Sequence, residues 1–174
     1  MTPVRRSIAH PREGTLHDSD VPLGGDEGEP QWELAGGQVD RLRVSLRVTG
    51  EDLDPDQVSI LLGVRPTFAA RRGDMRSTRG AAVRQHIGVW AFEMGTSSEW
   101  TLQDFIGALL DRIPAPLAAW RRLREEYEVD LFCGLFVDEW NRGTGLSSGI
   151  LERIAERRLS LSLDIYCGGI RGRS

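Results

Sequence analysis

The chain has 174 residues, a formal net charge of −4 and a pI near 5.4. This length suits one compact domain of roughly 100–150 residues with a tail beside it. The acidic balance argues against a nucleic-acid-binding surface over the whole protein, because such binding needs a net basic footprint.

The sequence also gives little support to a metal site or a membrane anchor. Cys133 and Cys167 lack the CxxC spacing of a structural zinc site, and His86 is the one histidine inside the expected domain. No apolar run approaches the ~18–20 residues that span a bilayer, and no signal-peptide core is visible. We therefore expect a reduced, cytoplasmic protein without metal or cofactor and without a membrane contact.

Composition divides the chain into three segments. Residues 1–38 are rich in Gly, Pro, Asp, Glu and Arg, and their apolar residues recur at no structural period. We expect residues 1–38 to form a disordered N-terminal tail and residues 39–167 a single α+β domain. Residues 168–174 are expected to be a flexible C-terminal tail.

The first half of the domain is expected to hold strands around one short helix. From Asp40 to Val48, apolar and polar residues alternate with a period of two, which predicts an amphipathic strand with a basic outer face. Asp54 can cap a short helix that ends at Gly63. A short strand over 67–70, a long exposed loop over 71–80 and a strand over 86–94 follow.

The second half begins with two helices. From Leu102 to Ile113 the apolar residues recur at helical spacing, and a second helix follows Pro116 with charged residues on its exposed side. Residues 129–137 are apolar on both faces, which is typical of a central strand. A loop over 141–149, a helix near Ile154 and a strand over 159–166 complete the domain.

This order of elements predicts a mixed β-sheet with helices packed mainly on one face, in a ferredoxin-like arrangement. The first and last strand-loop-helix-strand units resemble each other in order. A duplicated β-loop-α-β unit is one interpretation of that resemblance.

Several segments together resemble the bacterial family catalogued as domain of unknown function 4279. The resemblance runs from Asp40 to Tyr166, through GEDLDPDQVSILLGVRPT, GVW, LLDRI, LREEYEVDL and LSSGILERIAERRLSLSLDIY. Its most specific residues are Gly50, Asp52, Leu53, Pro55, Leu62, Gly63, Pro66, Leu163, Asp164 and Tyr166. The resemblance implies the bounds of a domain and no catalytic or binding residue.

Three motifs could carry chemistry, and each has a plainer interpretation. Gly143 and Gly145 lie in a loop between a strand and a helix, where backbone N–H groups can hold an anion, but a tight connection explains them as well. His86 could act as a general base, yet no spacing singles out a carboxylate to orient it. The alternating acidic residues of GEDLDPDQ lack the spacing of a calcium loop, and helix capping accounts for them.

The outer face of the sheet is the strongest candidate for a binding site. If the first and last strands share a sheet, Arg43, Arg47, Asp164 and Tyr166 face the same side. Trp90, Phe132 and Phe136 are expected to join them in a polar and aromatic platform. A second interpretation is that the tail, the 71–84 loop or another subunit covers this platform.

We therefore expect a non-enzymatic module that binds a protein partner, as an immunity protein binds a toxin. The alternative is a sensor of a small anion or ligand, or an enzyme, with its site between Arg43, Arg47 and the 141–149 loop. Nucleic-acid binding ranks third because the chain is acidic and lacks the aromatic signature of RNA-binding sheets. The sequence does not indicate the oligomeric state.

Overall fold

The computed structural model describes residues 37–78, 80–95, 99–138 and 141–168. Most of the two expected tails therefore lies outside the described residues. At the boundary, Gln38 forms an isolated parallel bridge with Gly143, and the Gly143 N–H donates to the Gly37 carbonyl at 3.0 Å. Gln38, which the sequence analysis placed in the N-terminal tail, is therefore paired with the loop before α4.

The described residues form four helices and seven strands, which confirms an α+β fold. In chain order these are β1 (Arg41–Gly50), α1 (Pro55–Leu62), β2 (Phe68–Ala70), β3 (Met75–Thr78), β4 (Ala81–Arg84), β5 (Gly88–Glu93), α2 (Leu102–Asp111), α3 (Leu117–Glu126), β6 (Glu128–Val137), α4 (Ser148–Glu156) and β7 (Ser160–Cys167). None of these helices is long and apolar enough to cross a membrane.

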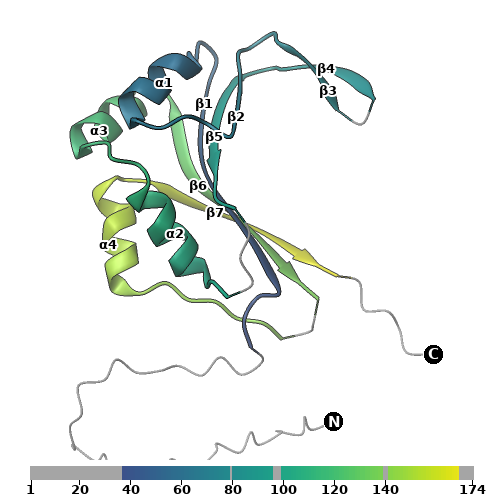
Figure 1. Cartoon of the computed structure of the whole chain (residues 1–174), viewed down its shortest axis with the longest axis vertical. Coiled ribbons are helices and arrows are strands. Elements are labelled where there is room, and N and C mark those ends of the chain that lie inside the picture. The colour runs from purple at the N-terminus through teal and green to yellow at the C-terminus, as the bar shows by residue number, and fades with distance from the viewer. Residues whose placement is uncertain (1–36, 79, 96–98, 139–140, 169–174) are drawn as a thin grey trace, which may run out of the picture. The chain divides into compact units, whose positions relative to one another are not determined.

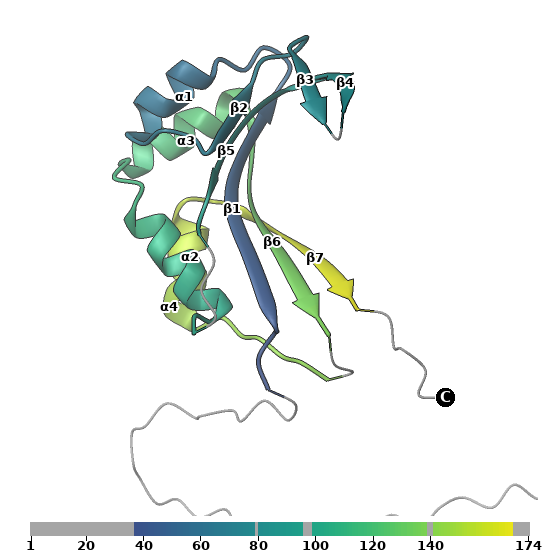
Figure 2. The ribbon, with the colours of Figure 1, turned by 45° about the vertical axis from the view of Figure 1, so that its right-hand side comes forward.

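The main sheet has five strands in the order β2-β5-β1-β6-β7. Only β6 and β7 pair in parallel, whereas the other three pairings are antiparallel, so the sheet is mixed as expected. Figures 1 and 2 show all four helices on one face of this sheet. The strand order does not confirm a ferredoxin-like topology.

The two units that resemble each other in sequence pair differently. In the second unit β6 and β7 are direct neighbours, but in the first unit β5 lies between β1 and β2. The order of elements along the chain is therefore similar, while the strand pairings are not.

Local signals explain where the helices begin and end. The side chain of Asp54 accepts a hydrogen bond from the Asp56 N–H at the start of α1, and Gly63 ends it with a φ of 70°. Thr101 and Asp104 form a capping box at the start of α2. These positions are set by short-range chemistry, and for α1 the sequence predicted them.

The core lies between the sheet and the helices. It is built from the inward residues of β1, β5 and β6 and from the apolar faces of the helices. The largest fully buried side chains are Trp90, Trp120, Phe105, Leu46, Leu62, Ile106, Leu109, Leu110, Leu123, Leu131, Val44 and Val48. The alternation along β1 and the helical spacing of α2 pointed toward this core, whereas Trp90 was expected on the outer face.

The predicted loop over 71–80 is partly wrong. Strands β3 and β4 pair as an antiparallel hairpin that forms its own two-stranded sheet and leaves the main sheet at one end (Figure 1). β4 is exposed along its whole length, so its sequence shows no alternation between buried and exposed positions. A strand of this kind gives no hydrophobic period from which it could be predicted.

Candidate functional site

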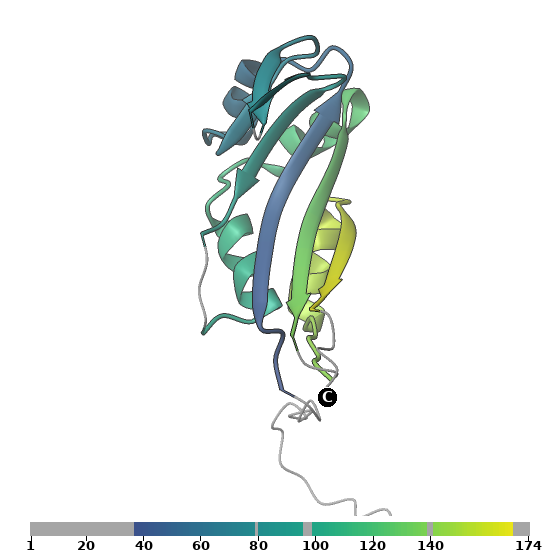
Figure 3. The ribbon, with the colours of Figure 1, turned by 90° about the vertical axis from the view of Figure 1, so that its right-hand side faces the viewer.

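One face of the main sheet is covered by none of the helices. Figure 3 shows the strands in front with the helices behind them. We use the name open face for nine of the outward side chains on the three strands β1, β6 and β7. They are Arg41, Arg43 and Arg47 of β1, Asp130, Phe132 and Phe136 of β6, and Ser162, Asp164 and Tyr166 of β7.

The strand register brings these residues together in rows. Arg41 pairs with Phe136, which pairs with Tyr166 on the other side. One row further along the open face, Gly134 lies between Arg43 and Asp164. β1 and β7 lie in one sheet, so the condition under which the sequence placed Arg43, Arg47, Asp164 and Tyr166 on one side is met.

Arg47 and Asp130 form the most connected polar contact of the open face. The Arg47 guanidinium donates two hydrogen bonds to the Asp130 carboxylate, from Nε at 2.9 Å and from Nη2 at 2.5 Å. The hydroxyl of Ser162 donates to the same carboxylate at 2.6 Å. Arg47 also lies 4.2 Å above the ring of Phe132. Both charged groups are thus held in one geometry, in the manner of a bidentate pair.

These contacts shift the ionisation of both residues. Burial raises the pKa of Asp130, but the hydrogen bonds from Arg47 and Ser162 and the charge of Arg47 outweigh it, so the pKa lies below 3.8. The hydrogen bond to Asp130 raises the pKa of Arg47. Asp130 is therefore a carboxylate at neutral pH, and it compensates the charge of Arg47.

Replacing Asp130 with asparagine should lower the free energy of unfolding at pH 7 by about 1–3 kcal/mol, because the Arg47 guanidinium loses a charged acceptor. The pKa of Asp130 is depressed in the folded state, so its contribution is present above pH 3.8 and is lost as the pH falls through the lower folded value. Urea unfolding at pH 7 and pH 3 measures this: the difference between parent and variant should shrink at pH 3.

The matched control for this prediction is Glu93→Gln. Glu93 pairs with Arg43 at 3.0 Å, but the two side chains are 41% and 60% exposed. A pair this exposed contributes under about 1 kcal/mol. Equal losses for both variants, or a loss at Asp130 that does not change with pH, would contradict the role given to Asp130.

A stack of three side chains covers the other end of the open face. The rings of Phe136 and Tyr166 lie 4.6 Å apart at 9°, and the guanidinium of Arg41 lies 4.1 Å from the centroid of Phe136. Tyr166 donates a hydrogen bond to Asp164 at 2.5 Å, and this bond raises the pKa of Tyr166. An arginine, two aromatic rings and a carboxylate thus lie within one small area.

Trp90 does not belong to this face, and the prediction that it joins the platform is wrong. Trp90 pairs with Val48, so it points to the helix side, and it is fully buried there. Its neighbours on β5 that share the facing of Arg43 and Arg47 are Glu93 and Ala91. Strand β5 has apolar residues on both faces, and only the register to β1 decides which face meets the core.

The loop that holds Gly143 and Gly145 lies at one end of β1. Arg142 in this loop contacts Asp40 at 3.2 Å, immediately before the strand begins. A hollow of about 440 Å³ lies instead at the other end of β1. It is lined by Arg47, Thr49, Val89, Glu128, Val129, Asp130, Ser160 and Ser162. The 141–149 loop therefore contributes nothing to the hollow beside Arg47.

Sequence reasoning missed Asp130, the central acceptor of the open face. The residue is the one charged side chain between Val129 and Val137, in a segment that is otherwise apolar. A lone charge in a central strand is costly to bury without a partner, which is a signal that a cation lies opposite. The partner itself is 83 residues away in the chain.

A family model described as a domain of unknown function (DUF4279) matches residues 40–168. The chain belongs to this family. This confirms the resemblance seen in the sequence. No curated protein and no solved structure matches the chain.

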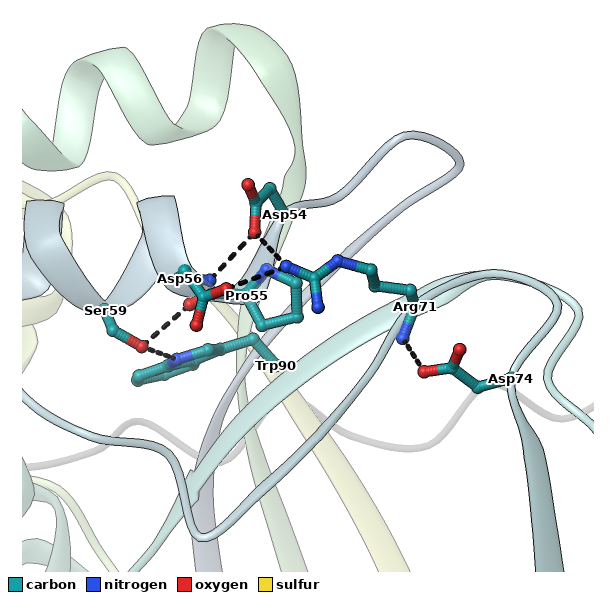
Figure 4. Close-up of polar contacts among 7 residues, drawn as sticks. All are labelled: Asp54, Pro55, Asp56, Ser59, Arg71, Asp74 and Trp90. Atoms are coloured by element: carbon teal, nitrogen blue, oxygen red, sulfur yellow. Dashed lines mark hydrogen bonds and ion pairs between the residues drawn. The ribbon is translucent and has the colours of Figure 1, made fainter.

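Part of the segment GEDLDPDQVSILLGVRPT, which lies within the family match, builds the start of α1 (Figure 4). The Arg71 guanidinium donates to Asp54 at 2.7 Å and to Asp56 at 2.8 Å. The Ser59 hydroxyl, one turn into α1, accepts from Trp90 Nε1 at 3.0 Å. These contacts tie the helix to β5 and to the hairpin side of the domain, so this part of the motif has a structural role.

The contacts of Asp54 and Asp56 with Arg71 are also relevant to the question of whether GEDLDPDQ binds calcium. Two of its carboxylates, on Asp54 and Asp56, already face Arg71. Within the described ranges, no group of three or more His, Cys, Asp and Glu side chains is placed to hold a metal ion. The acidic residues act here as a cap and as partners of an arginine.

The two cysteines are free thiols, as the sequence predicted. Cys133 is buried in β6 and Cys167 is exposed at the end of β7. Burial raises the pKa of Cys133 to about 12, so this thiol stays protonated and unreactive at neutral pH.

Proposed function

We propose that this DUF4279 domain is a non-enzymatic module that binds a protein partner through its open face. The observation that carries the proposal is a sheet face with three arginines and stacked aromatic rings that no helix covers. Arginine and aromatic side chains dominate binding energy at protein interfaces. Contacts within the face already hold several of these side chains, which lowers the entropy lost on binding.

The open face mixes charges of both signs. Arg41 and Arg43 are exposed, Arg43 pairs with Glu93, and Arg47 is compensated by Asp130. A partner is therefore selected by the positions of its charges more than by its net charge. An immunity-type role, in which the acidic domain masks a basic surface of a toxin, is the specific form of the proposal.

A cytoplasmic location belongs to the same proposal. An exposed free thiol at Cys167 is typical of a compartment that keeps cysteines reduced.

For the fold, a ferredoxin-like relationship is likewise proposed, and helices on one face of a mixed sheet support it.

The second candidate function is a sensor of a small anion or ligand, or an enzyme, that uses Arg43 and Arg47. The hollow of about 440 Å³ beside Arg47 favours it. However, Nε and Nη2 of Arg47 both donate to Asp130, so this carboxylate already compensates the charge of Arg47 and competes with an anion for it. We therefore rank the sensor or enzyme below the protein-binding module.

The test compares two double variants of the full chain in affinity capture from a cell extract. Arg43→Glu with Tyr166→Ala changes the open face at two exposed positions, and Arg121→Glu with Leu117→Ala makes a matched change on α3. A partner that binds through the open face should be recovered by the parent and by the α3 variant. Its affinity should fall by at least about 30-fold in the open-face variant.

The opposite pattern would refute the proposal. A partner that is retained by the open-face variant and lost by the α3 variant would place the interface on the helices. A small anion such as phosphate that raises the melting temperature of the parent, but not of Arg43→Glu, would support the second candidate function instead.

A further inference from the structure

Among the residues that the structure describes, strand β7 is an edge of the main sheet. It has eight residues and pairs with β6 on one side only, whereas the opposite edge strand β2 has three residues. Natural proteins usually protect a long edge with lysine or arginine, proline, a bulge or a covering segment. β7 contains no basic residue and no proline, and Asp164 is its single charge.

The exposed side chains of β7 are unusually apolar for an edge. On the helix side, Leu163 is 52% exposed and Ile165 is 59% exposed. On the open face, Tyr166 is 45% exposed. The edge thus combines free backbone hydrogen-bonding groups with an apolar strip, which is the combination that pairs with another strand.

We propose that β7 pairs with β7 of a second copy of this chain, antiparallel and around a two-fold axis at Leu163. The sheets of the two copies would then join into one continuous sheet. This inference does not depend on the proposed function, because the open face stays uncovered in such a dimer.

The register follows from geometry and charge. In an antiparallel pair of identical strands related by a two-fold axis, the numbers of any two facing residues add up to the same value. This value is even, because two facing residues must point to the same side of the sheet. Two registers pair seven of the eight residues, one centred on Leu163 and one on Asp164. The second places two aspartates directly opposite each other, which is destabilising. The first places Asp164 opposite the Ser162 hydroxyl of the second copy.

The Leu163 register also matches the apolar residues. Leu163 meets its own copy at the axis, and Ile165 meets Leu161 on either side of it. β7 of the second copy therefore places aliphatic side chains against the exposed aliphatic side chains of β7. In this register Asp164 faces no like charge, and the apolar side chains of β7 face one another, so a second copy is the occupant that β7 fits.

The dimer would place both open faces on the same side of the joined sheet. A two-fold axis between antiparallel strands of one sheet is perpendicular to that sheet, so equivalent faces stay together. The interface would be isologous, with the same strand from each copy. A partner of the open face would then meet two equivalent sites side by side.

The first experiment measures the mass of the full chain by sedimentation over a range of concentrations. The parent should be a dimer, and Leu163→Lys should weaken the dimer by about 100-fold, because two like charges then meet at the axis. Ile60→Lys on α1 is the control, since Ile60 is 73% exposed and lies on another element. The control should sediment as the parent does. A parent that stays a monomer at its solubility limit would overturn the proposal.

A disulfide experiment tests the register itself, in a Cys167→Ser background. With Leu163→Cys, the two Cα atoms across the axis should lie about 4.5–5.5 Å apart, within reach of a disulfide. With Ile165→Cys they should lie about 14 Å apart, beyond its reach. We expect a covalent dimer on non-reducing gels for Leu163→Cys, formed at least tenfold faster than for Ile165→Cys. Equal rates, or fast crosslinking of Asp164→Cys instead, would refute the Leu163 register.

Discussion

Replacing Trp90 with alanine is expected to lower the free energy of unfolding by about 3–5 kcal/mol, the range for removing a buried aromatic side chain. The indole is fully buried between β5 and α1. It also donates to the Ser59 hydroxyl, which in turn donates to the Pro55 carbonyl at 2.7 Å. Trp90 therefore joins the sheet to the helix that carries part of the family motif.

Two milder variants separate the packing from the hydrogen bond. Ser59→Ala keeps the indole and removes its acceptor, which should lower the free energy of unfolding by about 1–3 kcal/mol. Ile60→Ala, the next residue of the same helix, is the control and should change it by less than about 0.5 kcal/mol because this side chain is exposed. Urea denaturation monitored by circular dichroism measures all three. A Trp90→Ala loss no larger than that of Ile60→Ala would contradict the core position of Trp90.

The second large effect is expected at Gly88, where alanine should lower the free energy of unfolding by about 2–3 kcal/mol through overpacking. A Cβ at this position would lie 2.7 Å from the Leu53 Cβ and 2.9 Å from the carbonyl oxygen of Gly50. Gly50 is the strand partner of Gly88, and a Cβ there would lie 2.6 Å from the ring of Tyr127. The two glycines let this end of the sheet pack closely under α1 and α3.

Gly149 provides the control for Gly88, measured by the same urea denaturation. A Cβ at Gly149 would meet nothing within 4 Å, and the residue lies in helix α4. Alanine there should stabilise the protein by about 0.5–1 kcal/mol, because glycine in a helix loses more backbone entropy on folding. Equal free energies of unfolding for Gly88→Ala and Gly149→Ala would contradict the close packing at Gly88, because β1 and β5 would then have to separate easily to admit the methyl group.

The proposed dimer and the proposed binding face can be tested separately. Leu163→Lys changes the helix side of the edge strand and should leave the Arg43 and Tyr166 side chains in place. A monomeric variant that still captures the partner would support the binding face without the dimer. A dimeric parent that captures nothing specific would support the edge pairing alone.

The sequence by itself determined the features that depend on near neighbours in the chain. The alternation along β1, the cap at Asp54, the glycine stop at Gly63 and the spacing of α2 were all readable, because each involves residues a few positions apart. The family resemblance was readable for the same reason, as a run of local motifs over residues 40–166, and the family model matches residues 40–168. The facing of β1 and β7 followed from their alternation once they shared a sheet.

Only the tertiary structure decided the features that depend on pairing between distant strands. Trp90 is buried because β5 meets β1 in one register, and a shift of one residue would have placed it on the open face. Arg47 finds Asp130 across 83 residues, which no local pattern encodes. The exposed edge of β7 exists because β7 is last in the strand order. Strand order and register are set by the packing of the whole domain, so the short-range periods of the sequence do not contain them.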